Sequence, residues 1–324
     1  MHGISSGPPN YQRFGNGARL ENATIRRYMN LSWREVRARL GRLAAVAVAD
    51  LPADPLDRRD PAFIVEEREW LGALCATWYA PDVLGLENIP PGRALIVGTH
   101  NGGYMAPDMF SLMVASWHEW DPAERVAYGL AHDFVLRVPL VGRWLAKLGA
   151  VPASPHNAER LLGRNVAVLV YPGGDRDAFK ASRDQHVVSF AGRKGFVRMA
   201  LRTQAPIVPV VSVGAHGVFH LFTDGAGLAR ALGLKKYFRM DVLPIGLALP
   251  TGLLVSVATP YVPVPTKIRV RVLSPIELGH PPAAASDEAV VQELHDRVVA
   301  VMQAGVDALV AEGGFGVKAR FLES

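Results

Sequence analysis

The chain has 324 residues, of which 49% are hydrophobic and 20% are charged, and its formal net charge is +5. This is the composition of a globular protein with a sizeable core, so a mainly disordered or fibrous chain is excluded. The sequence contains one cysteine, Cys75. An intramolecular disulfide and a cysteine-based metal cage are therefore excluded, and an intracellular protein is indicated.

The first 80 residues divide into two parts. Residues 1–22 are rich in Gly, Pro and Asn, so we expect them to be flexible. They contain no apolar segment of the kind that forms a secretory signal. Gly3–Gly7 matches the nucleophile elbow of serine hydrolases, but without the strand and helix that the elbow requires. Residues 23–80 are predicted to be helical, with helices over residues 32–49 and 62–79.

The first of these helices is basic. Ser32 followed by Glu35 is a capping-box pattern that predicts its start. Apolar residues recur at helical spacing, with arginines between them (Trp33, Val36, Leu40, Leu43 and Ala47). Six arginines lie in residues 26–42, against Glu35 alone (Arg26, Arg27, Arg34, Arg37, Arg39 and Arg42). Such a helix can lie on an anionic membrane surface, or it can pack on its own domain with its arginines in water. No nucleic-acid motif accompanies the arginines, so we expect no nucleic-acid partner.

Residues 81–324 are predicted to form one α/β domain. Apolar runs typical of buried strands occupy residues 94–98, 126–130, 166–171 and 207–213, and helical patterns follow Pro107 and cover residues 138–148 and 195–203. Continuous apolar strands separated by helices indicate a mostly parallel central sheet flanked by helices, with helical N- and C-terminal additions. Ser286 is expected to cap a final helix over residues 286–312.

Residues 242–266 form a stretch of 25 residues without a charge, long enough to span a bilayer. Five prolines interrupt it, and proline breaks helical hydrogen bonding. We therefore expect buried or membrane-facing irregular structure here rather than a transmembrane helix. Residues 267–272 alternate between charged and apolar side chains, which predicts a strand.

The first segment that can carry chemistry follows the strand 94–98. His100 and Asn101 stand where open α/β sheets place their sites, at the carboxyl end of a buried strand. Gly102 allows the backbone to approach a ligand closely. Asp108 could fix the tautomer of the imidazole and stabilise its charged form. A loop histidine and a helix-capping aspartate are the alternative interpretation.

Two further segments offer groups that bind anions. Gly173 and Gly174 follow the strand 166–171 and can direct backbone N–H groups at an oxyanion or a phosphate. Arg176 adds a forked donor for phosphate or carboxylate, although Pro-Gly-Gly alone is also typical of a plain β-turn. Arg193 could hold a phosphate at the start of the helix 195–203, or it could belong to a solvated face.

Two other patterns point to functions that we do not expect. His216 and His220 are four residues apart, as metal ligands on a helix can be, but position 217 is Gly where a zinc protease has Glu. We expect these histidines in a loop and predict no metal. The sequence also has no Gly-x-x-x-x-Gly-Lys loop, which argues against a nucleoside triphosphatase.

Taken in order, these segments resemble the PlsC-type glycerolipid acyltransferases of the lysophospholipid acyltransferase superfamily, in particular the branch that includes the diacylglycerol acyltransferases. Thr99–Asp108 resembles the family's Asn-His-x4-Asp motif, and Tyr171–Ala178 matches Tyr-Pro-Gly-Gly-x-Arg-Glu-Ala of the diacylglycerol branch. Three further segments resemble the usual lead-in, the middle motif and the last motif (Leu84–Pro90, Gly149–Ser154 and Ala205–Pro209). The resemblance covers residues 80–280.

The resemblance implies a glycerol-3-phosphate acyltransferase-like fold, with residues 81–324 as the acyltransferase domain, and an O-acyltransferase that moves a fatty acyl group to a hydroxyl of a glycerolipid. It implies acyl-CoA or an acyl carrier protein as donor, a lipid acceptor, a membrane surface as partner, and no cofactor. We expect a cytoplasmic protein peripherally attached to the membrane. His100 would be the general base and Asp108 its partner; the substrate would contact Asn101, Gly102, Gly173, Gly174, Arg176 and Arg193.

Two departures from the family pattern bear on this expectation. Seven residues separate His100 from Asp108 instead of four, which on a regular helix would keep the two side chains apart. Gly173 stands where the PlsC enzymes have Glu, which favours a less charged acceptor than lysophosphatidate. A noncatalytic lipid-binding protein on the same fold and a lipid esterase are the alternative functions.

Overall fold

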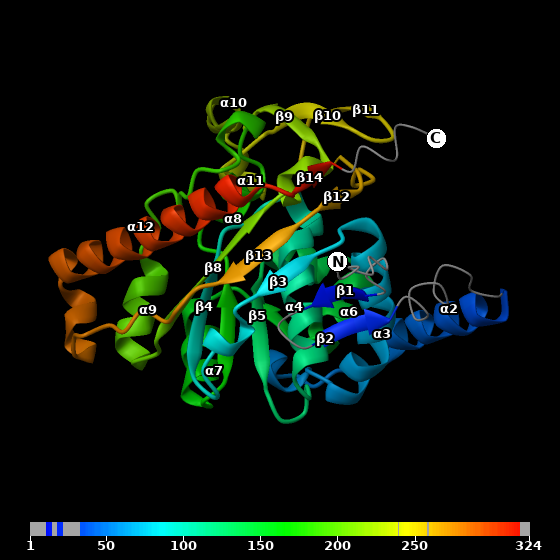
Figure 1. Cartoon of the computed structure of the whole chain (residues 1–324), viewed down its shortest axis with the longest axis horizontal. Coiled ribbons are helices and arrows are strands. Elements are labelled where there is room, and N and C mark those ends of the chain that lie inside the picture. The colour runs from blue at the N-terminus through cyan, green and yellow to red at the C-terminus, as the bar shows by residue number, and fades with distance from the viewer. Residues whose placement is uncertain (1–10, 15–17, 22–32, 239, 258, 318–324) are drawn as a thin grey trace, which may run out of the picture.

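A computed structural model describes residues 11–14, 18–21, 33–238, 240–257 and 259–317 (Figure 1). Nine strands form one sheet in the order β2 (Ala18–Glu21), β1 (Tyr11–Phe14), β3 (Asp82–Leu84), β13 (Arg269–Val272), β8 (Ile207–Val213), β4 (Ala94–Gly98), β7 (Ala167–Val170), β5 (Ala127–Ala131) and β6 (Ala150–Pro152). All neighbours from β8 to β6 are parallel, whereas β13 is antiparallel to β8, and β1 to β2. The predicted mostly parallel sheet is confirmed.

Helices cover both faces of this sheet, as its apolar strands require. In β4 the side chains of Ala94 and Ile96 join one core, and those of Leu95 and Val97 join the other. The first core includes α3 (Pro61–Trp78) and α4 (Pro107–Glu119). The second includes α7 (Pro155–Gly163), α9 (Gly195–Thr203) and α12 (Glu288–Glu312) (Figure 1). The alternation of strand side chains thus produces two separate cores.

Apart from α2 (Trp33–Val48), the remaining described helices are short and lie in the connections. They are α5 (Asp133–Arg137), α6 (Val141–Lys147), α8 (Gly174–Ala178), α10 (Ala226–Ala231) and α11 (Leu234–Phe238). Six 3-10 turns accompany them: Pro55–Asp57, Leu86–Asn88, Gly103–Met105, Ser182–Asp184, Ala215–Val218 and Pro282–Ser286.

The two predicted N-terminal helices are confirmed but differ in burial. The helix α3 begins after its cap Asp60 and buries Ile64, Leu71 and Cys75. The helix α2 (Trp33–Val48) contacts α6 and buries Val46, but leaves Leu40 and Val48 exposed. The apolar residues of α2 are therefore not all packed on its own domain. Ser32, the expected cap, lies outside the described residues.

The N-terminal 22 residues contain regular structure that their composition does not predict. Residues 11–14 and 18–21 form the antiparallel pair β1–β2, and Phe14 pairs with Val83 of β3. Backbone hydrogen bonding to an existing sheet can order a segment whose own propensity is weak. Residues 1–10, 15–17 and 22 are outside the described part of the chain.

The stretch without charges, residues 242–266, forms strands and loops. Its strands β10 (Ile245–Ala248) and β11 (Gly252–Leu254) pair with β9 (His220–Thr223) in a three-stranded antiparallel sheet. This small sheet lies beyond the carboxyl ends of the central strands (Figure 1). Within the described residues, no helix has both the length and the apolar character that crossing a bilayer requires.

The C-terminal region closes the second core. The predicted strand 267–272 is present as β12 (Thr266–Lys267) and β13, and β12 pairs with β14 (Gly316–Val317). The helix α12 buries its predicted apolar side. Its cap is Asp287 rather than Ser286, because the Asp287 carboxylate accepts the N–H groups of Ala289 and Val290 while Ser286 ends a 3-10 turn.

Candidate active site

The polar segments predicted to carry chemistry meet at the carboxyl edge of the central sheet. The strand β4 lies between β8 and β7 and runs parallel to both. The loops that follow these strands, which begin at Thr99, Tyr171 and Gly214, are therefore neighbours. This is the edge at which parallel α/β sheets bind their ligands.

The loop between His100 and Asp108 folds back on itself. Gly102, Gly103 and Ala106 all have positive φ, and α4 begins at Pro107, so Asp108 lies in its first turn. His100 Nδ1 is 4.0 Å from Asp108 Oδ1. The His100 side chain is 17% exposed and that of Asp108 is 2% exposed. The longer spacing in this sequence therefore still brings the two side chains near each other, although His100 Nδ1 forms no hydrogen bond among the described residues.

Burial sets the protonation of this pair. Burial, and to a smaller extent the positive charge of Lys180, lowers the pKa of His100 to about 4. Burial raises the pKa of Asp108 to about 7, against hydrogen bonds from the backbone N–H groups of Met109 and Asn101. Both shifts favour the uncharged forms, as expected for ionisable groups removed from water. At neutral pH the imidazole is unprotonated and can accept a proton.

Asn101 supports the Asp108 carboxylate. Its backbone N–H donates to Asp108 Oδ2 at 2.9 Å, and its side-chain amide donates to Ser212 Oγ at 3.2 Å. The Ser212 hydroxyl in turn donates to Asp108 Oδ2 at 3.3 Å. Asn101 is buried, so its side chain helps to hold Asp108 and faces the interior of the protein.

A second carboxylate, Asp177, holds the backbone of His100. Asp177 Oδ2 accepts the His100 N–H at 2.6 Å, and Oδ1 lies 2.6 Å from Lys180 Nζ. Asp177 is buried, and burial raises its pKa although Lys180 opposes the shift. The hydrogen bond from the His100 N–H to Asp177 joins the loop after β4 to the segment after β7. The positive charge of Lys180 offsets the negative charge of the buried Asp177 carboxylate.

Tyr171 packs beside the imidazole. The rings of His100 and Tyr171 are 5.0 Å apart and inclined at 40°. A Cβ atom at Gly98 would lie 2.3 Å from Tyr171 Cε1, so only glycine at the end of β4 leaves room for this ring. The tyrosine of the predicted Tyr-Pro-Gly-Gly segment thus forms one wall of the site.

The two glycines of that segment are required by their surroundings. A Cβ atom at Gly173 would lie 2.3 Å from Asp177 Cβ, and Gly174 has a φ of +56°, a left-handed conformation that favours glycine. Arg193 donates to the carbonyls of Pro172 and Gly173 at 3.0 and 2.8 Å, and its Nη2 is 3.0 Å from Asp241 Oδ2. Its guanidinium therefore braces the loop.

Arg176 differs from Arg193. It lies in the short helix α8 between the two aspartates Asp175 and Asp177. Arg176 is half-buried, and no described residue forms a hydrogen bond or an ion pair with its guanidinium, although its charge helps to lower the pKa of Asp241. The Arg176 guanidinium therefore lies near the candidate site and forms no hydrogen bond or ion pair with the described residues.

Other predicted segments do not reach the site. Gly149–Ser154 forms β6 at the far edge of the sheet, and Ser154 caps α7. His216 is buried with Nε2 2.8 Å from the Lys180 carbonyl oxygen, whereas His220 is exposed in β9. The described residues contain no group of three His, Cys, Asp or Glu side chains that could hold a metal ion.

Four residues of the site were not identified as such from the sequence. Asp177 lies within the matched motif, and Ser212 is the one hydroxyl in the apolar strand β8, which is a signal because buried polar groups need partners. Lys180 had no such signal. The Tyr261 hydroxyl donates to the Gly102 carbonyl at 2.8 Å and accepts the Met105 N–H at 3.3 Å; it comes from the apolar stretch far along the chain.

Comparisons with known proteins place the chain in a family. The diacylglycerol acyltransferase family model matches residues 72–307. An uncharacterized protein of Mycobacterium tuberculosis is 35% identical over 237 residues, which cover 72% of this chain and 63% of that protein. The chain thus spans less than two thirds of this relative's length. The human 2-acylglycerol O-acyltransferase 3 is 29% identical over 157 residues, 46% of each protein.

A solved structure also aligns with the chain. The crystal structure of the 1-acyl-sn-glycerophosphate acyltransferase PlsC from Thermotoga maritima covers 89% of this chain, and 88% of that chain is covered in return. The TM-score is 0.43 and the sequence identity is 20%.

Proposed function

The chain belongs to the diacylglycerol acyltransferase family, and from this premise we propose that it transfers a fatty acyl group from a thioester donor, acyl-CoA or an acyl carrier protein, to a hydroxyl of a glycerolipid. The observation that carries the proposal is the 4.0 Å approach of His100 Nδ1 to Asp108 Oδ1 at the carboxyl edge of the sheet. An imidazole beside a carboxylate is a suitable base for such a reaction, since the acceptor hydroxyl must lose its proton as it attacks.

His100 acts as the general base. Its lowered pKa keeps the ring unprotonated at neutral pH. Because Nδ1 is buried against Asp108, the nitrogen that faces the acceptor is Nε2. Proton transfer to a positioned base accelerates such a step roughly 10²–10⁴-fold. Asp108, when ionised, stabilises the imidazolium that forms.

The reaction needs no covalent enzyme intermediate. The acceptor oxygen attacks the thioester carbonyl, its proton passes to Nε2, and the C–S bond breaks as the proton is returned to the leaving thiolate. The oxyanion forms beside the backbone N–H groups of Gly102 and Gly103 or of Gly173, since the Gly174 N–H already donates to the Tyr171 carbonyl. Removal of one such donor typically costs roughly 10²–10³-fold in rate.

Arg176 positions a phosphate of the donor. The absence of a bonded partner for its guanidinium among the described residues supports this role.

Gly173 leaves no room for the glutamate of the PlsC motif, because Asp177 occupies that space. This agrees with an uncharged acceptor such as a mono- or diacylglycerol.

The helix α2 attaches the protein to the cytoplasmic face of a membrane. Its exposed side chains include Leu40 and Val48 together with Arg34, Arg37 and Arg42. A helix of this kind binds anionic lipid through both its apolar area and its charge. Sedimentation with anionic vesicles, and not with neutral ones, is the expected result.

Purified protein incubated with radiolabelled palmitoyl-CoA and mono- or diacylglycerol tests the proposal. We expect labelled ester lipid from the wild type and a loss of at least 10²-fold in His100→Ala. His186→Ala is the matched control, because His186 lies outside the site and its Nδ1 forms no hydrogen bond among the described residues.

The other outcomes identify the alternative functions. Free fatty acid as the sole product, lost in His100→Ala, would indicate a lipid esterase. Lipid binding without turnover would indicate a noncatalytic protein on this fold. Either result contradicts the proposed transfer.

A further inference from the structure

One loop of the candidate site contains backbone N–H groups that have no acceptor. Gly102 and Gly103 are buried, and neither N–H donates a hydrogen bond to another described residue. Buried backbone donors in folded proteins almost always have a partner, so this pair indicates an oxygen atom that a bound substrate supplies. Successive N–H groups in a turn can hold an anion. The loop carries His100, so these donors lie close in the chain to the base of the proposed reaction.

The Tyr261 side chain holds this loop. Its hydroxyl donates to the Gly102 carbonyl at 2.8 Å and accepts the Met105 N–H at 3.3 Å. One oxygen atom therefore ties Gly102 to the end of the 3-10 turn Gly103–Met105. Burial raises the pKa of Tyr261 above its ordinary value, so the hydroxyl keeps its proton at neutral pH and remains a donor.

The bond to the Gly102 carbonyl also fixes the N–H of Gly103. The carbonyl and the N–H belong to one peptide unit, which is trans, so they point in opposite directions. Because Tyr261 holds the carbonyl, the N–H is directed away from the tyrosine. A hydrogen bond to the carbonyl oxygen also polarises the amide, and a polarised N–H is a stronger donor. Tyr261 thus determines both the direction and the strength of this donor.

Packing keeps the Tyr261 ring in place. The ring lies 5.4 Å from that of Phe219 and is inclined to it at 70°, and Phe219 is in turn stacked 6.0 Å from Phe179. The next residue, Val262, donates its N–H to the Leu249 carbonyl at 2.7 Å, which ties this part of the chain to the small sheet. The hydroxyl is therefore held against the His100 loop by contacts that lie outside that loop.

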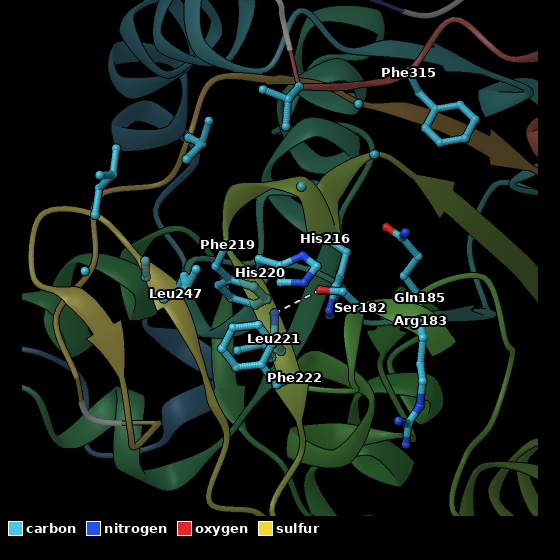
Figure 2. A pocket seen from close by; sticks show the side chains of 18 residues that line it. Ser182, Arg183, Gln185, His216, Phe219, His220, Leu221, Phe222, Leu247 and Phe315 are labelled. Atoms are coloured by element: carbon cyan, nitrogen blue, oxygen red, sulfur yellow. Dashed lines mark hydrogen bonds between the residues drawn. The ribbon is translucent and has the colours of Figure 1, made fainter.

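The same layer of aromatic side chains borders a groove that is open to solvent beneath β9–β11. Four segments line the groove, within residues 182–185, 214–222, 247–252 and 315–317, together with Val264. Figure 2 shows Phe219 in this lining, between Leu247 and Ser182. Tyr261 does not line the groove. Removal of its hydroxyl therefore alters the contact with the His100 loop and leaves the groove lining unchanged.

We propose that Tyr261 is a positioning residue for the acyl transfer, and that its hydroxyl fixes the Gly103 N–H as a donor to the oxyanion. The inference rests on the proposed function, because the oxyanion forms only when a thioester is attacked. The acceptor oxygen bonds to the thioester carbon while its proton passes to His100, and an electron pair of the C=O bond moves to the carbonyl oxygen. That oxygen accepts the Gly103 N–H until the C–S bond breaks and the C=O bond re-forms. Tyr261 acts through the peptide and exchanges no proton.

Gly173 offers a competing donor with a similar arrangement. Its N–H shares a peptide with the Pro172 carbonyl, to which Arg193 donates at 3.0 Å. The loop after β4 is the better candidate, because it has two adjacent buried donors and because these follow the base His100 closely in the chain. Stabilisation of the oxyanion by Gly173 alone would make the reaction independent of the Tyr261 hydroxyl.

Tyr261→Phe removes the hydroxyl and keeps the ring. Initial rates of transfer from radiolabelled palmitoyl-CoA to diacylglycerol are measured with the full chain at varied donor concentrations. We expect kcat to fall about 10- to 10²-fold, less than for complete loss of an oxyanion donor, while KM for palmitoyl-CoA changes less than about twofold. Hydrolysis of palmitoyl-CoA by water passes through the same oxyanion, so its rate should fall by the same factor. The pH profile should keep its shape, because His100 is unchanged.

Tyr128→Phe is the matched control. The Tyr128 hydroxyl also donates to a distant backbone carbonyl, that of Leu56, at 2.8 Å, and Tyr128 lies in β5, outside the candidate site. Both variants lose one hydrogen bond of the same kind, so both should show a similar fall in thermal stability. Tyr128→Phe should transfer acyl groups as the wild type does.

Phe219→Leu tests the inference if Tyr261→Phe fails to fold. It keeps the tyrosine hydroxyl but removes the aromatic contact that orients the ring. We expect kcat to fall about two- to tenfold with KM for palmitoyl-CoA unchanged.

The outcomes separate this inference from the proposed function. Transfer by Tyr261→Phe at the wild-type kcat overturns the inference, assigns the oxyanion to Gly173 and leaves the proposed function intact. A raised KM with an unaltered kcat would place Tyr261 in substrate binding, and an equal loss of kcat in Tyr128→Phe would show a general structural effect; either result also overturns the inference. Wild-type protein that forms no labelled ester lipid would contradict the proposed function and, with it, this role of Tyr261.

Discussion

Two neighbouring regions of this molecule are built in opposite ways. At the edge of the central sheet, His100, Asp108 and Asp177 are held by short hydrogen bonds and an ion pair, and glycines leave no space for extra atoms. In the groove beneath β9–β11 the side chains are apolar and many are half exposed. The first region is closely packed and polar, and the second is an apolar surface open to solvent.

The contrast predicts how each region responds to substitution. Buried polar networks lose their function when one member is left without its partner. Exposed apolar surfaces tolerate single changes with little effect on stability. We therefore expect changes at the sheet edge to affect both folding and activity, and single changes on the exposed apolar surface to affect stability little.

The largest expected effect comes from Gly173→Glu, which introduces the residue of the PlsC motif. Its Cβ would overlap Asp177 Cβ at 2.3 Å, and its carboxylate would enter a site with a buried aspartate. We expect a destabilisation of at least about 3 kcal/mol, measured by chemical unfolding. Gly163→Glu is the control, because no atom lies within 4 Å of a Cβ at that helical position. Equal stability of the two variants would mean that the loop after β7 is not tightly packed.

Asp177→Asn comes next. It leaves the Lys180 ammonium buried without its carboxylate, which costs about 3–5 kcal/mol for pairs of this kind. Activity should fall by the same factor for every acyl chain length, since the residue positions the His100 backbone. We expect Lys180→Met in the same background to restore more than half of the lost stability. Failure of that rescue would argue against the ion pair as the cause.

Asp108→Asn probes the pH dependence. Because burial raises the pKa of Asp108 from 3.8 to about 7, the fold favours the protonated carboxyl, and this contribution to stability is lost as pH rises through about 7. The variant should therefore gain stability relative to the wild type between pH 4 and 7, while activity at pH 8 falls about tenfold or more. Thermal unfolding and rate profiles against pH measure both.

His100→Gln should show the opposite trend. The lowered pKa of His100, about 4 against an ordinary 6.5, contributes stability that is present above pH 6.5 and is lost as pH falls toward 4. The His100→Gln variant should therefore gain stability relative to the wild type only at acid pH. Parallel stability curves for the wild type and both variants would contradict the assigned burial of the pair.

The smallest effect is expected for Leu253→Ser in β11. Leu253 is 52% exposed and does not line the groove, so its replacement should change the free energy of unfolding by less than about 0.5 kcal/mol. Leu254, the next residue, is fully buried, and Leu254→Ala should cost about 2–5 kcal/mol. A large effect at Leu253 would show that the small sheet is packed more firmly than its exposure indicates.

The sequence by itself determined the central elements and the segments that carry chemistry. Strands β4, β7 and β8 are continuous apolar runs, and α9 and α12 have clear helical periodicity, so local patterns were sufficient. His100, Asp108 and the Tyr171–Asp177 segment follow strand ends, where chemistry is expected in such sheets. The small sheet in residues 242–266 was missed because prolines mask the strand pattern.

Only the tertiary structure decided how these segments are joined. Whether Asp108 turns back to His100 depends on left-handed residues in the loop, and its partner Ser212 comes from another strand. Tyr261 also reaches the loop of His100 from a distant part of the chain, since its hydroxyl donates to the Gly102 carbonyl. The groove is likewise formed by four segments that are distant in the chain. Local periodicity reports burial within one element, whereas these contacts arise from the packing of elements against one another, which no short window of sequence contains.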